Sequence, residues 1–241
     1  MTINKVPRSF VFDSNMFVIV GKDKTALIDT GFAVTYDYTL AAIKDILDGK
    51  KLDYIIITHR HQDHIAGLSR MLKDFPGVKA YAGHRDIEVI RSGGDQMPEG
   101  YAERYKNIAE ELNSLHEGVK FDMRELIKPV KDISPLYEGD KFDLEGHVLE
   151  IIETPGHTVG AICILDSVTK SIFTGDSFHV RNLGVTHHPT GSEEDIVNSA
   201  NKLLNYDFVS LHPGHGDSIE VNGKDCLRYG LFFNKHKGMK M

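Results

Sequence analysis

The side chains of greatest chemical interest lie in one short stretch, Thr-His-Arg-His-Gln-Asp-His at positions 58–64. It follows an apolar run, residues 54–57, that is typical of a buried strand. In an extended chain His59 and His61 point to the same side, because strand side chains alternate with a period of two. One loop can therefore supply two imidazoles to a single cation.

A second set of ligands follows where this loop turns into the apolar, helix-like segment 65–72. The turn carries Asp63 and His64 to a neighbouring point, where a carboxylate and an imidazole can bind a second cation. Zinc accepts this mixture of nitrogen and oxygen ligands, and iron or manganese also accepts it. Histidines in solvated loops are common, but His-x-His-x-Asp-His straight after a hydrophobic strand is a specific spacing, and we interpret it as a metal site.

The composition is that of an ordinary globular protein of 241 residues, 41% hydrophobic and 26% charged. A formal net charge of -7 argues against binding nucleic acid by neutralising phosphates. The two cysteines suggest no disulfide framework, which fits a reducing compartment. The first residues lack the apolar run of a signal peptide, and no stretch is apolar over the length of a membrane span. We therefore expect a cytoplasmic protein, monomer or homodimer, that acts on a small molecule and has no nucleic-acid or membrane partner.

Strand and helix patterns alternate along the chain in a way that would position such a site. The sequence predicts strands at residues 9–12, 15–20, 25–29, 53–58, 78–82, 141–144, 147–153, 161–165, 171–174 and 207–211. It predicts helices at residues 36–47 and 192–204. A short, gapped similarity between residues 53–63 and 207–217 suggests two halves, each a sheet with helices. An α/β fold of the four-layer αββα sandwich type satisfies this arrangement.

The middle of the chain, residues 84–135, has helical rather than strand patterning. Apolar side chains recur at steps of four and three through Tyr101, Tyr105 and Ile108, which predicts one face of a helix. We expect this range to be a helical insert within a single domain that spans residues 1–241. The apolar face can simply pack against the body of the protein, or the insert can also form a wall or lid over the metal site, with both tyrosines in contact with substrate.

Three later turns present metal-capable side chains where strands end. They carry His157 in Thr-Pro-Gly-His-Thr, Asp176 in Thr-Gly-Asp, and His215 in His-Pro-Gly-His-Gly. Proline and glycine favour sharp turns at such points. Asp29 ends an earlier strand, where its carboxylate either faces a site at the end of the sheet or caps the turn that follows.

Together these motifs resemble, in order and spacing, those of the metallo-β-lactamase superfamily. The resemblance covers about residues 10–220 apart from the middle insert, and it implies an αββα fold with a dinuclear metal site. By motif, one metal would be held by His59, His61 and His157, the other by Asp63, His64 and His215, and Asp176 would bridge them. Asp29 matches the first acidic motif, which holds the ligand loop from behind without binding metal.

Such a site implies hydrolysis. Metal ions lower the pKa of bound water to about 7, so a bridging hydroxide can attack a carbonyl carbon. Asp63 and Asp176 are the candidate catalytic residues, and Asp63 lies where it can steer the proton of the hydroxide. We expect two divalent ions, zinc in the first place, with iron or manganese as alternatives.

The second half of the chain looks like the thioesterases of the glyoxalase II type, so we expect a zinc-dependent hydrolase of a thioester or a lactone. The chain ends soon after Gly230, without the additional C-terminal helical portion that carries glutathione contacts in the longer members. His212 fits no motif position, and we interpret it as supporting the site or as structural. Candidate substrate contacts are Tyr101, Tyr105, His179, Arg181 and His188.

Other functions share these motifs. A mononuclear iron persulfide dioxygenase would hold one iron per chain and consume oxygen. A phosphodiesterase or nuclease of the same fold is disfavoured by the acidic charge and by the lack of a basic arm. A metal-dependent scaffold without catalysis would need only four closed ligands, fewer than this chain offers.

Overall fold

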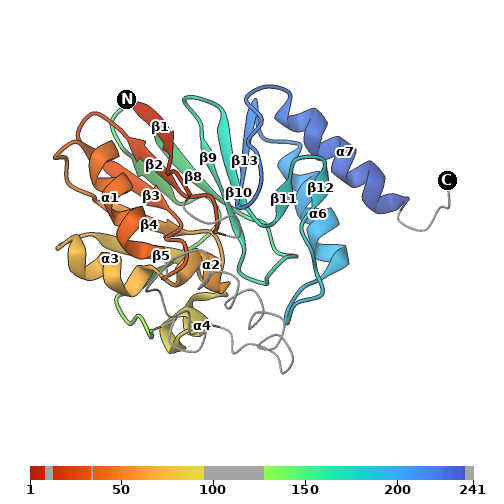
Figure 1. The fold of residues 1–241 in the computed structure, drawn as a ribbon. Coiled ribbons are helices and arrows are strands. Elements are labelled where there is room, and N and C mark those ends of the chain that lie inside the picture. The colour runs from red at the N-terminus through yellow and green to blue at the C-terminus, as the bar shows by residue number, and fades with distance from the viewer. Residues whose placement is uncertain (9–12, 34, 95–127, 237–241) are drawn as a thin grey trace, which may run out of the picture.

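Two β-sheets packed face to face, with helices on their outer faces, form the four layers of the fold (Figure 1). The computed structural model describes residues 1–8, 13–33, 35–94 and 128–236. One apolar cluster lies between the sheets. A second lies between the first sheet and its helices, and a third lies between the second sheet and its helices. The αββα sandwich that the sequence predicts is confirmed.

The first sheet is formed by the N-terminal half of the chain, in the order β1-β2-β3-β4-β5-β6. Neighbouring strands from β1 to β3 are antiparallel, and those from β3 to β6 are parallel. The strands are β1 (Thr2–Lys5), β2 (Phe17–Val20), β3 (Thr25–Ile28), β4 (Tyr54–Ile57), β5 (Lys79–Gly83) and β6 (Ile133–Leu136).

The second sheet comes from the C-terminal half, in the order β13-β10-β9-β8-β7. Only its β10–β13 pair is parallel. The strands are β7 (Lys141–Asp143), β8 (Val148–Glu153), β9 (Ile162–Asp166), β10 (Ser171–Gly175) and β13 (Ser210–Pro213). A small antiparallel pair, β11 (Phe178–His179) and β12 (Asn182–Leu183), follows β10.

The helices are divided between the two outer faces, with α1 and α3 on the first sheet and α6 and α7 on the second (Figure 1). Their bounds, with those of two short helices near the loops, are α1 (Tyr36–Leu47), α2 (Gln62–Ile65), α3 (Leu68–Asp74), α4 (Ile87–Ser92), α6 (Glu193–Leu203) and α7 (Gly223–Lys235). Within the described part of the chain, no helix combines the length and apolar character needed to cross a bilayer.

Strand β4 shows why an unbroken apolar run forms a strand here. Ile55 and Ile57 point to the cluster beneath the helices, and Ile56 points to the cluster between the sheets. Both faces of the sheet are covered, so alternating side chains on both sides must be apolar. This buried strand ends at Ile57, where the loop with His59, His61 and His64 begins.

The two long helices that the sequence predicts also form. Helix α1 buries Tyr36, Thr39, Ile43 and Leu47, which lie on one face at helical spacing. Helix α6 begins after Ser192, whose hydroxyl accepts a hydrogen bond from the backbone N–H of Asp195 at 3.1 Å, as the capping pattern predicts.

Some predicted elements are wrong in extent. The segment 65–72 is divided between α2 and α3, and at the break the N–H of Gly67 donates to the carbonyl of Gly31 at 3.1 Å rather than along the helix. The range 84–135 is not helical throughout, because Ile133–Leu136 is strand β6. The expected strand at 9–12 and the middle of the insert, with Tyr101 and Tyr105, lie outside the described residues.

Candidate metal centre

Four strands, β4, β8, β10 and β13, deliver the candidate ligands to one edge of the sandwich, and β3 delivers Asp29 behind them. Strands β3 and β4 are parallel, and β8, β10 and β13 also share a direction, so the carboxyl ends of each set lie together. The two sheets are joined at this edge by a hydrogen bond from the N–H of Ile162 to the carbonyl of Thr58 at 2.9 Å. The turns after these strands therefore meet across the gap between the sheets.

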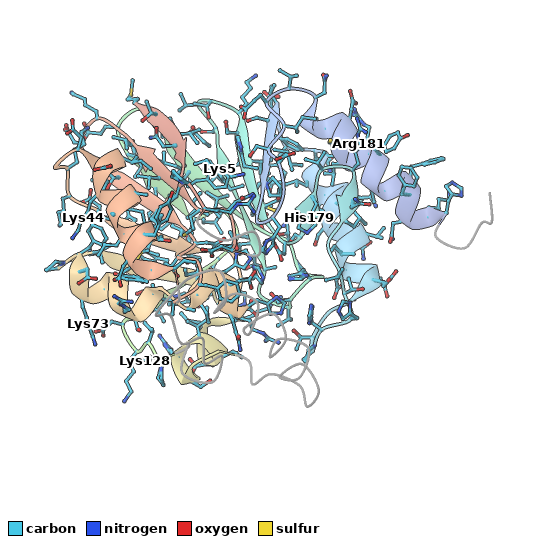
Figure 2. The ribbon with its side chains drawn as sticks, in the orientation of Figure 1. Lys5, Lys44, Lys73, Lys128, His179 and Arg181 are labelled. Atoms are coloured by element: carbon cyan, nitrogen blue, oxygen red, sulfur yellow. The ribbon has the colours of Figure 1, made fainter. Side chains whose placement is uncertain are left out.

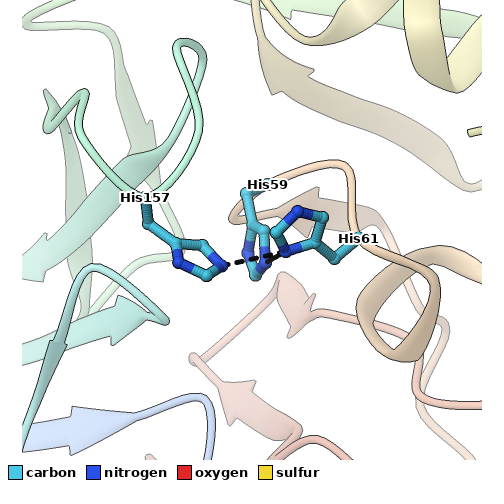
Figure 3. Close-up of side chains that lie close together, drawn as sticks. All are labelled: His59, His61 and His157. Carbon is cyan, nitrogen blue, oxygen red and sulfur yellow. Dashed lines mark hydrogen bonds between the residues drawn. The ribbon is translucent and has the colours of Figure 1, made fainter. Parts of the chain in front are cut away.

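Three histidines form the first group of candidate ligands (Figure 3). Nδ1 of His61 lies 3.1 Å from Nε2 of His59 and 2.9 Å from Nε2 of His157. Two nitrogens bound to one tetrahedral zinc ion at about 2.1 Å would be about 3.4 Å apart. The three nitrogens are therefore spaced almost as ligands of one cation, although they come from two distant turns.

Neighbouring groups keep these imidazoles neutral and correctly oriented. Nδ1 of His157 donates a hydrogen bond to the carbonyl of Val185 at 2.7 Å, which leaves a lone pair on Nε2. Burial lowers the pKa of His157 to about 4 and that of His61 to about 3. Burial, helped by the neighbouring imidazoles, also lowers the pKa of His59 well below its usual value. Neutral imidazole is the form that binds metal.

The second group consists of Asp63, His64, Asp176 and His215. Oδ2 of Asp63 lies 2.7 Å from Nε2 of His215 and 3.5 Å from Nε2 of His64. Oδ1 of Asp176 lies 3.5 Å from the same nitrogen of His64. Two carboxylates and two imidazoles thus converge on one point beside the first group.

Two atoms of the second group are buried without any hydrogen-bond partner in the described residues, Nε2 of His64 and Oδ1 of Asp176. Such atoms are costly unless something else satisfies them. Nδ1 of His64 donates to Oδ2 of Asp29 at 2.8 Å, so the lone pair of the ring is on Nε2 and points at Asp176. A divalent cation would satisfy both atoms, so the donor set fits a metal ion.

Asp29 holds the first ligand loop from behind. Besides its contact with His64, Oδ1 of Asp29 accepts a hydrogen bond from the N–H of Thr58 at 2.8 Å, and Oδ2 accepts one from the Thr58 hydroxyl at 2.8 Å. Asp29 itself has a φ of 59°, a left-handed conformation that short polar residues tolerate. The acidic residue at the end of β3 therefore faces the site and orients His64.

Asp176 lies between the two groups. Its Oδ2 is 3.6 Å from Nε2 of His215 and 3.8 Å from Nε2 of His157, so one carboxylate faces ligands of both groups. Burial alone would raise the pKa of Asp176, but the imidazoles around it, His64 first and then His215 and His59, hold it well below its usual value. The carboxylate is thus ionised and placed to contact two cations.

Asp86 is a further buried carboxylate at this edge, and sequence analysis missed it. It is fully buried directly before α4, where it accepts hydrogen bonds from the Thr158 hydroxyl at 2.7 Å and from the N–H of Gly160 at 3.1 Å. It also accepts a bond from the N–H of Arg60 at 3.2 Å, and its Oδ1 lies 3.6 Å from the Arg60 guanidinium. Asp86 therefore ties the turn of His59 and His61 to the turn of His157.

The candidate substrate contacts fall in different places. His188 lies beside the first group, with its ring centroid 4.8 Å from that of His61. His179 lies next to the second group, because Asp176 and the backbone of His215 both raise its pKa. Burial lowers the pKa of His179 by more than these groups raise it, so the pKa is lower than usual. Arg181 is exposed, and its guanidinium lies over the ring of Tyr229 on α7, away from both groups (Figure 2).

The model of the metallo-beta-lactamase superfamily matches residues 10–215. A probable metallo-hydrolase of Methanocaldococcus jannaschii is 30% identical over 92% of this chain and 95% of its own length. The hydroxyacylglutathione hydrolase GloC of Haemophilus influenzae is 27% identical over 92% of this chain and 93% of its own length. The crystal structure of the BLEG-1 B3 metallo-beta-lactamase, 16% identical, superposes with a TM-score of 0.71 over 96% of this chain and 99% of that one, which shows a common fold. The chain therefore belongs to the metallo-beta-lactamase superfamily.

Proposed function

We propose that this protein is a hydrolase that uses two divalent metal ions to cleave an ester-type carbonyl, a thioester or a lactone, in a small molecule. The observation that carries the proposal is the position of Asp176, whose carboxylate faces both groups of candidate ligands. Two cations at adjacent sites repel each other, and an ionised carboxylate between them offsets that repulsion.

The two groups divide the metal-binding roles. His59, His61 and His157 would hold one ion, and Asp63, His64 and His215 the other, with Asp176 shared. A pair of zinc ions bound there would lower the pKa of a water molecule and polarise the carbonyl of the substrate. The ligands are all nitrogen and oxygen, so iron and manganese are also accepted by this set.

The chain's own residues supply the proton chemistry. Burial raises the pKa of Asp63, but His64 and the hydrogen bond and charge of His215 lower it overall, so the carboxylate is ionised and can accept a proton. The Ser14 hydroxyl donates to the backbone carbonyl of Asp63 at 2.6 Å and fixes this turn. We assign Asp63 the role of proton acceptor during attack, and Asp176 the role of orienting the reacting centre between the groups.

The substrate class rests on the site and on one relative. An ester-type carbonyl needs activation at the carbonyl oxygen and a nucleophile, and a dinuclear site serves both needs without a serine or cysteine nucleophile. Cys163 is unsuited to that role, because it is buried in β9 and burial raises the pKa of its thiol to about 12. The name of the Haemophilus influenzae relative, a hydroxyacylglutathione hydrolase, supports a thioester. His188 and His179 lie where they can contact the substrate.

The proposal is tested with a panel of model substrates. Purified protein, chelated and then reloaded with zinc, iron or manganese, is assayed with a thioester, a lactone, a β-lactam and a phosphodiester. We expect the thioester or the lactone to be cleaved at least tenfold faster than the other two classes, and only by metal-loaded protein. Faster cleavage of the phosphodiester would contradict the proposal, as would one iron per chain with oxygen consumption.

A further inference from the structure

A buried segment just before β2, Asp13 to Asn15, contacts parts of the chain that lie far apart in the sequence. Each of its residues is at most 1% exposed. Oδ1 of Asp13 accepts a hydrogen bond from the N–H of Phe32 at 2.9 Å, in the loop after β3. The Ser14 hydroxyl donates to the carbonyl of Asp63 at 2.6 Å, where α2 begins. The segment therefore joins the loops that follow two parallel strands of the first sheet.

Asn15 donates to three carbonyls of the turn that carries His215. Its side-chain amide nitrogen lies 2.8 Å from the carbonyl oxygen of Pro213 and 2.9 Å from that of Gly216. Its backbone N–H donates to the carbonyl of Gly214 at 2.6 Å. The amide nitrogen carries two hydrogens, one for each of its acceptors. One residue before β2 of the first sheet therefore fixes carbonyls on both sides of His215, which follows a strand of the second sheet.

A side chain that only fills space would not need the amide of Asn15. Its Oδ1 is buried and has no hydrogen-bond partner in the described residues. Such an unpaired oxygen destabilises the fold, and leucine, which has a similar shape, would fill the position without it. Leucine, however, would offer no donor to the carbonyls of Pro213 and Gly216. The two N–H groups of the amide are therefore the property that this position requires.

The turn that Asn15 holds carries a ligand of the second group. His215 is flanked by Gly214 and Gly216, and glycine restricts the backbone less than any other residue. Hydrogen bonds from outside the turn are therefore needed to hold the imidazole. Its Nε2 lies 2.7 Å from Oδ2 of Asp63, although the two residues are 152 positions apart. The place of His215 beside Asp63 thus depends on a residue from the opposite sheet.

The first group of ligands is held by other residues. The turn of His157 is tied down by the hydrogen bond from Thr158 to Asp86, and Nδ1 of His157 donates to the carbonyl of Val185. The hydrogen bonds of Asn15 end instead on residues 213–216. A change at Asn15 should therefore act on the second group and spare the first.

We propose that Asn15 is a positioning residue for the second metal ion. By holding the turn 213–216, it keeps His215 directed at Asp63 and Asp176, and so it sets the affinity of the second site and not that of the first. Asn15 acts through this ligand and contacts neither ion nor substrate. The inference rests on the proposed binding of two metal ions, and it is independent of the bond that the enzyme cleaves.

The experiment uses the full chain, chelated and then exposed to zinc at free concentrations set by a chelator buffer. Imidazole ¹⁵N resonances report the occupancy of each site, through His157 for the first and His215 for the second. Asn15→Ala removes both amide donors and keeps the backbone N–H, and Asn15→Ser keeps one side-chain donor. We expect the zinc concentration at half occupancy of His215 to rise about tenfold to a hundredfold in Asn15→Ala and by less in Asn15→Ser. The value for His157 should stay within about threefold of the parent protein.

Thr25→Val is the matched control, because it also removes a buried hydrogen bond. Thr25 is 1% exposed, and its hydroxyl donates to the carbonyl of Lys51 at 2.6 Å, at the end of β3 that lies away from Asp29. The control should lose stability but bind zinc at both sites like the parent protein. This comparison separates positioning of His215 from a general loss of stability, which would not distinguish the two sites.

The inference is overturned if His215 in Asn15→Ala binds zinc as in the parent, or if His157 and His215 lose zinc to the same extent. Should Asn15→Ala fail to fold, the same comparison is made with Asn15→Ser, where a selective loss at His215 of a few fold is expected and an unchanged ratio of the two sites overturns the inference. A parent protein in which His215 never responds to zinc would instead overturn the proposed pair of metal ions, and the inference with it.

Discussion

The hydroxyl of Thr158 donates a hydrogen bond to Oδ2 of Asp86 over 2.7 Å, across 72 residues of sequence. Because Asp86 also accepts the N–H of Arg60, this contact connects the turn before His61 with the turn that carries His157. The spacing of the three-histidine group thus depends on a carboxylate that belongs to neither turn.

Replacing Asp86 by asparagine should weaken metal binding. The amide keeps the volume of the carboxylate but loses its charge and part of its capacity to accept the bonds from Arg60, Thr158 and Gly160. We expect the affinity of the first site to fall about tenfold or more, as measured by competition with a chromophoric chelator. Asp23→Asn, at an exposed turn position, serves as the control. Unchanged affinity in the Asp86 variant would show that the two turns are positioned without it.

Asp29→Asn should affect the second metal ion more than the first. An asparagine at this position would tolerate the φ of 59°, but it cannot hold His64 as a carboxylate does. We expect the metal retained after dialysis to fall from two ions per chain towards one. The control is Asp48→Asn, since Asp48 also has a positive φ, 46°, and is exposed. Retention of two tightly bound ions in the Asp29 variant would contradict the role given to this residue.

Gly214 has no room for a side chain. A Cβ atom there would lie 2.3 Å from Oδ1 of Asp176 and 2.7 Å from Cε1 of His64. Gly214→Ala should therefore displace two candidate ligands and lower the rate of hydrolysis at least a hundredfold, at a metal concentration that saturates the parent protein. Gly139→Ala has open space but a φ of 84°, so it should cost about 1 kcal/mol of stability and leave the rate unchanged. Equal rates for both variants would contradict the geometry of the second group.

Glu138 makes stability depend on pH at the outer side of the second sheet. Burial raises its pKa, but the bond from Lys202 at 2.7 Å, the N–H of Glu153 and the Tyr206 hydroxyl lower it overall below its usual value. A carboxyl group whose pKa is lower in the folded state stabilises the fold above its unfolded pKa, and this contribution is lost as the pH falls through the folded value.

Glu138→Gln should therefore lower the free energy of unfolding at pH 7 by about 0.5 kcal/mol, because the group is partly exposed. The difference from the parent protein should shrink towards zero as the pH falls through the lowered pKa of Glu138, in urea unfolding followed by circular dichroism. Glu194→Gln, at an exposed position of α6, is the control. A difference that grows on acidification would contradict the assigned direction.

The sequence was sufficient for the parts of the fold that depend on local pattern. Helix α1 has the predicted bounds, and the strand before the His59 loop is nearly as predicted, because each carries a complete apolar periodicity. Strand β6 was missed because Pro135 argues against a strand, yet β6 is at the edge of its sheet, where a missing N–H is tolerated.

Helix α7 was missed for a different reason. Gly223 and Gly230 weaken its helical pattern, and Gly230 is needed because the backbone of Asn182 lies where a Cβ atom would make a 3.2 Å contact. That contact is with β12 and cannot be seen in the local sequence. Strand β1 likewise exists through its pairing with β2 rather than through its own apolar pattern.

At the candidate site, side chains next to strand ends were easy to find and those acting across the fold were not. His157 and Asp176 follow predicted strands in turn motifs, and the structure brings them within 3.8 Å. Asp86 also follows a predicted strand, residues 78–82, and this signal could have identified it. Its partners Thr158 and Gly160 could not be predicted, because they meet it only when the two sheets pack together.

The central claim is that two cations are held by two groups of ligands that share Asp176. Calorimetric titration of chelated protein with zinc tests it most directly, in the parent protein and in Asp176→Ala, with circular dichroism as a check of the fold. We predict two equivalents of zinc for the parent, with turnover appearing only as the second is bound, and a folded variant that binds less zinc and has lost turnover. A single equivalent in the parent, or full turnover by the variant or by chelated protein, would contradict the account.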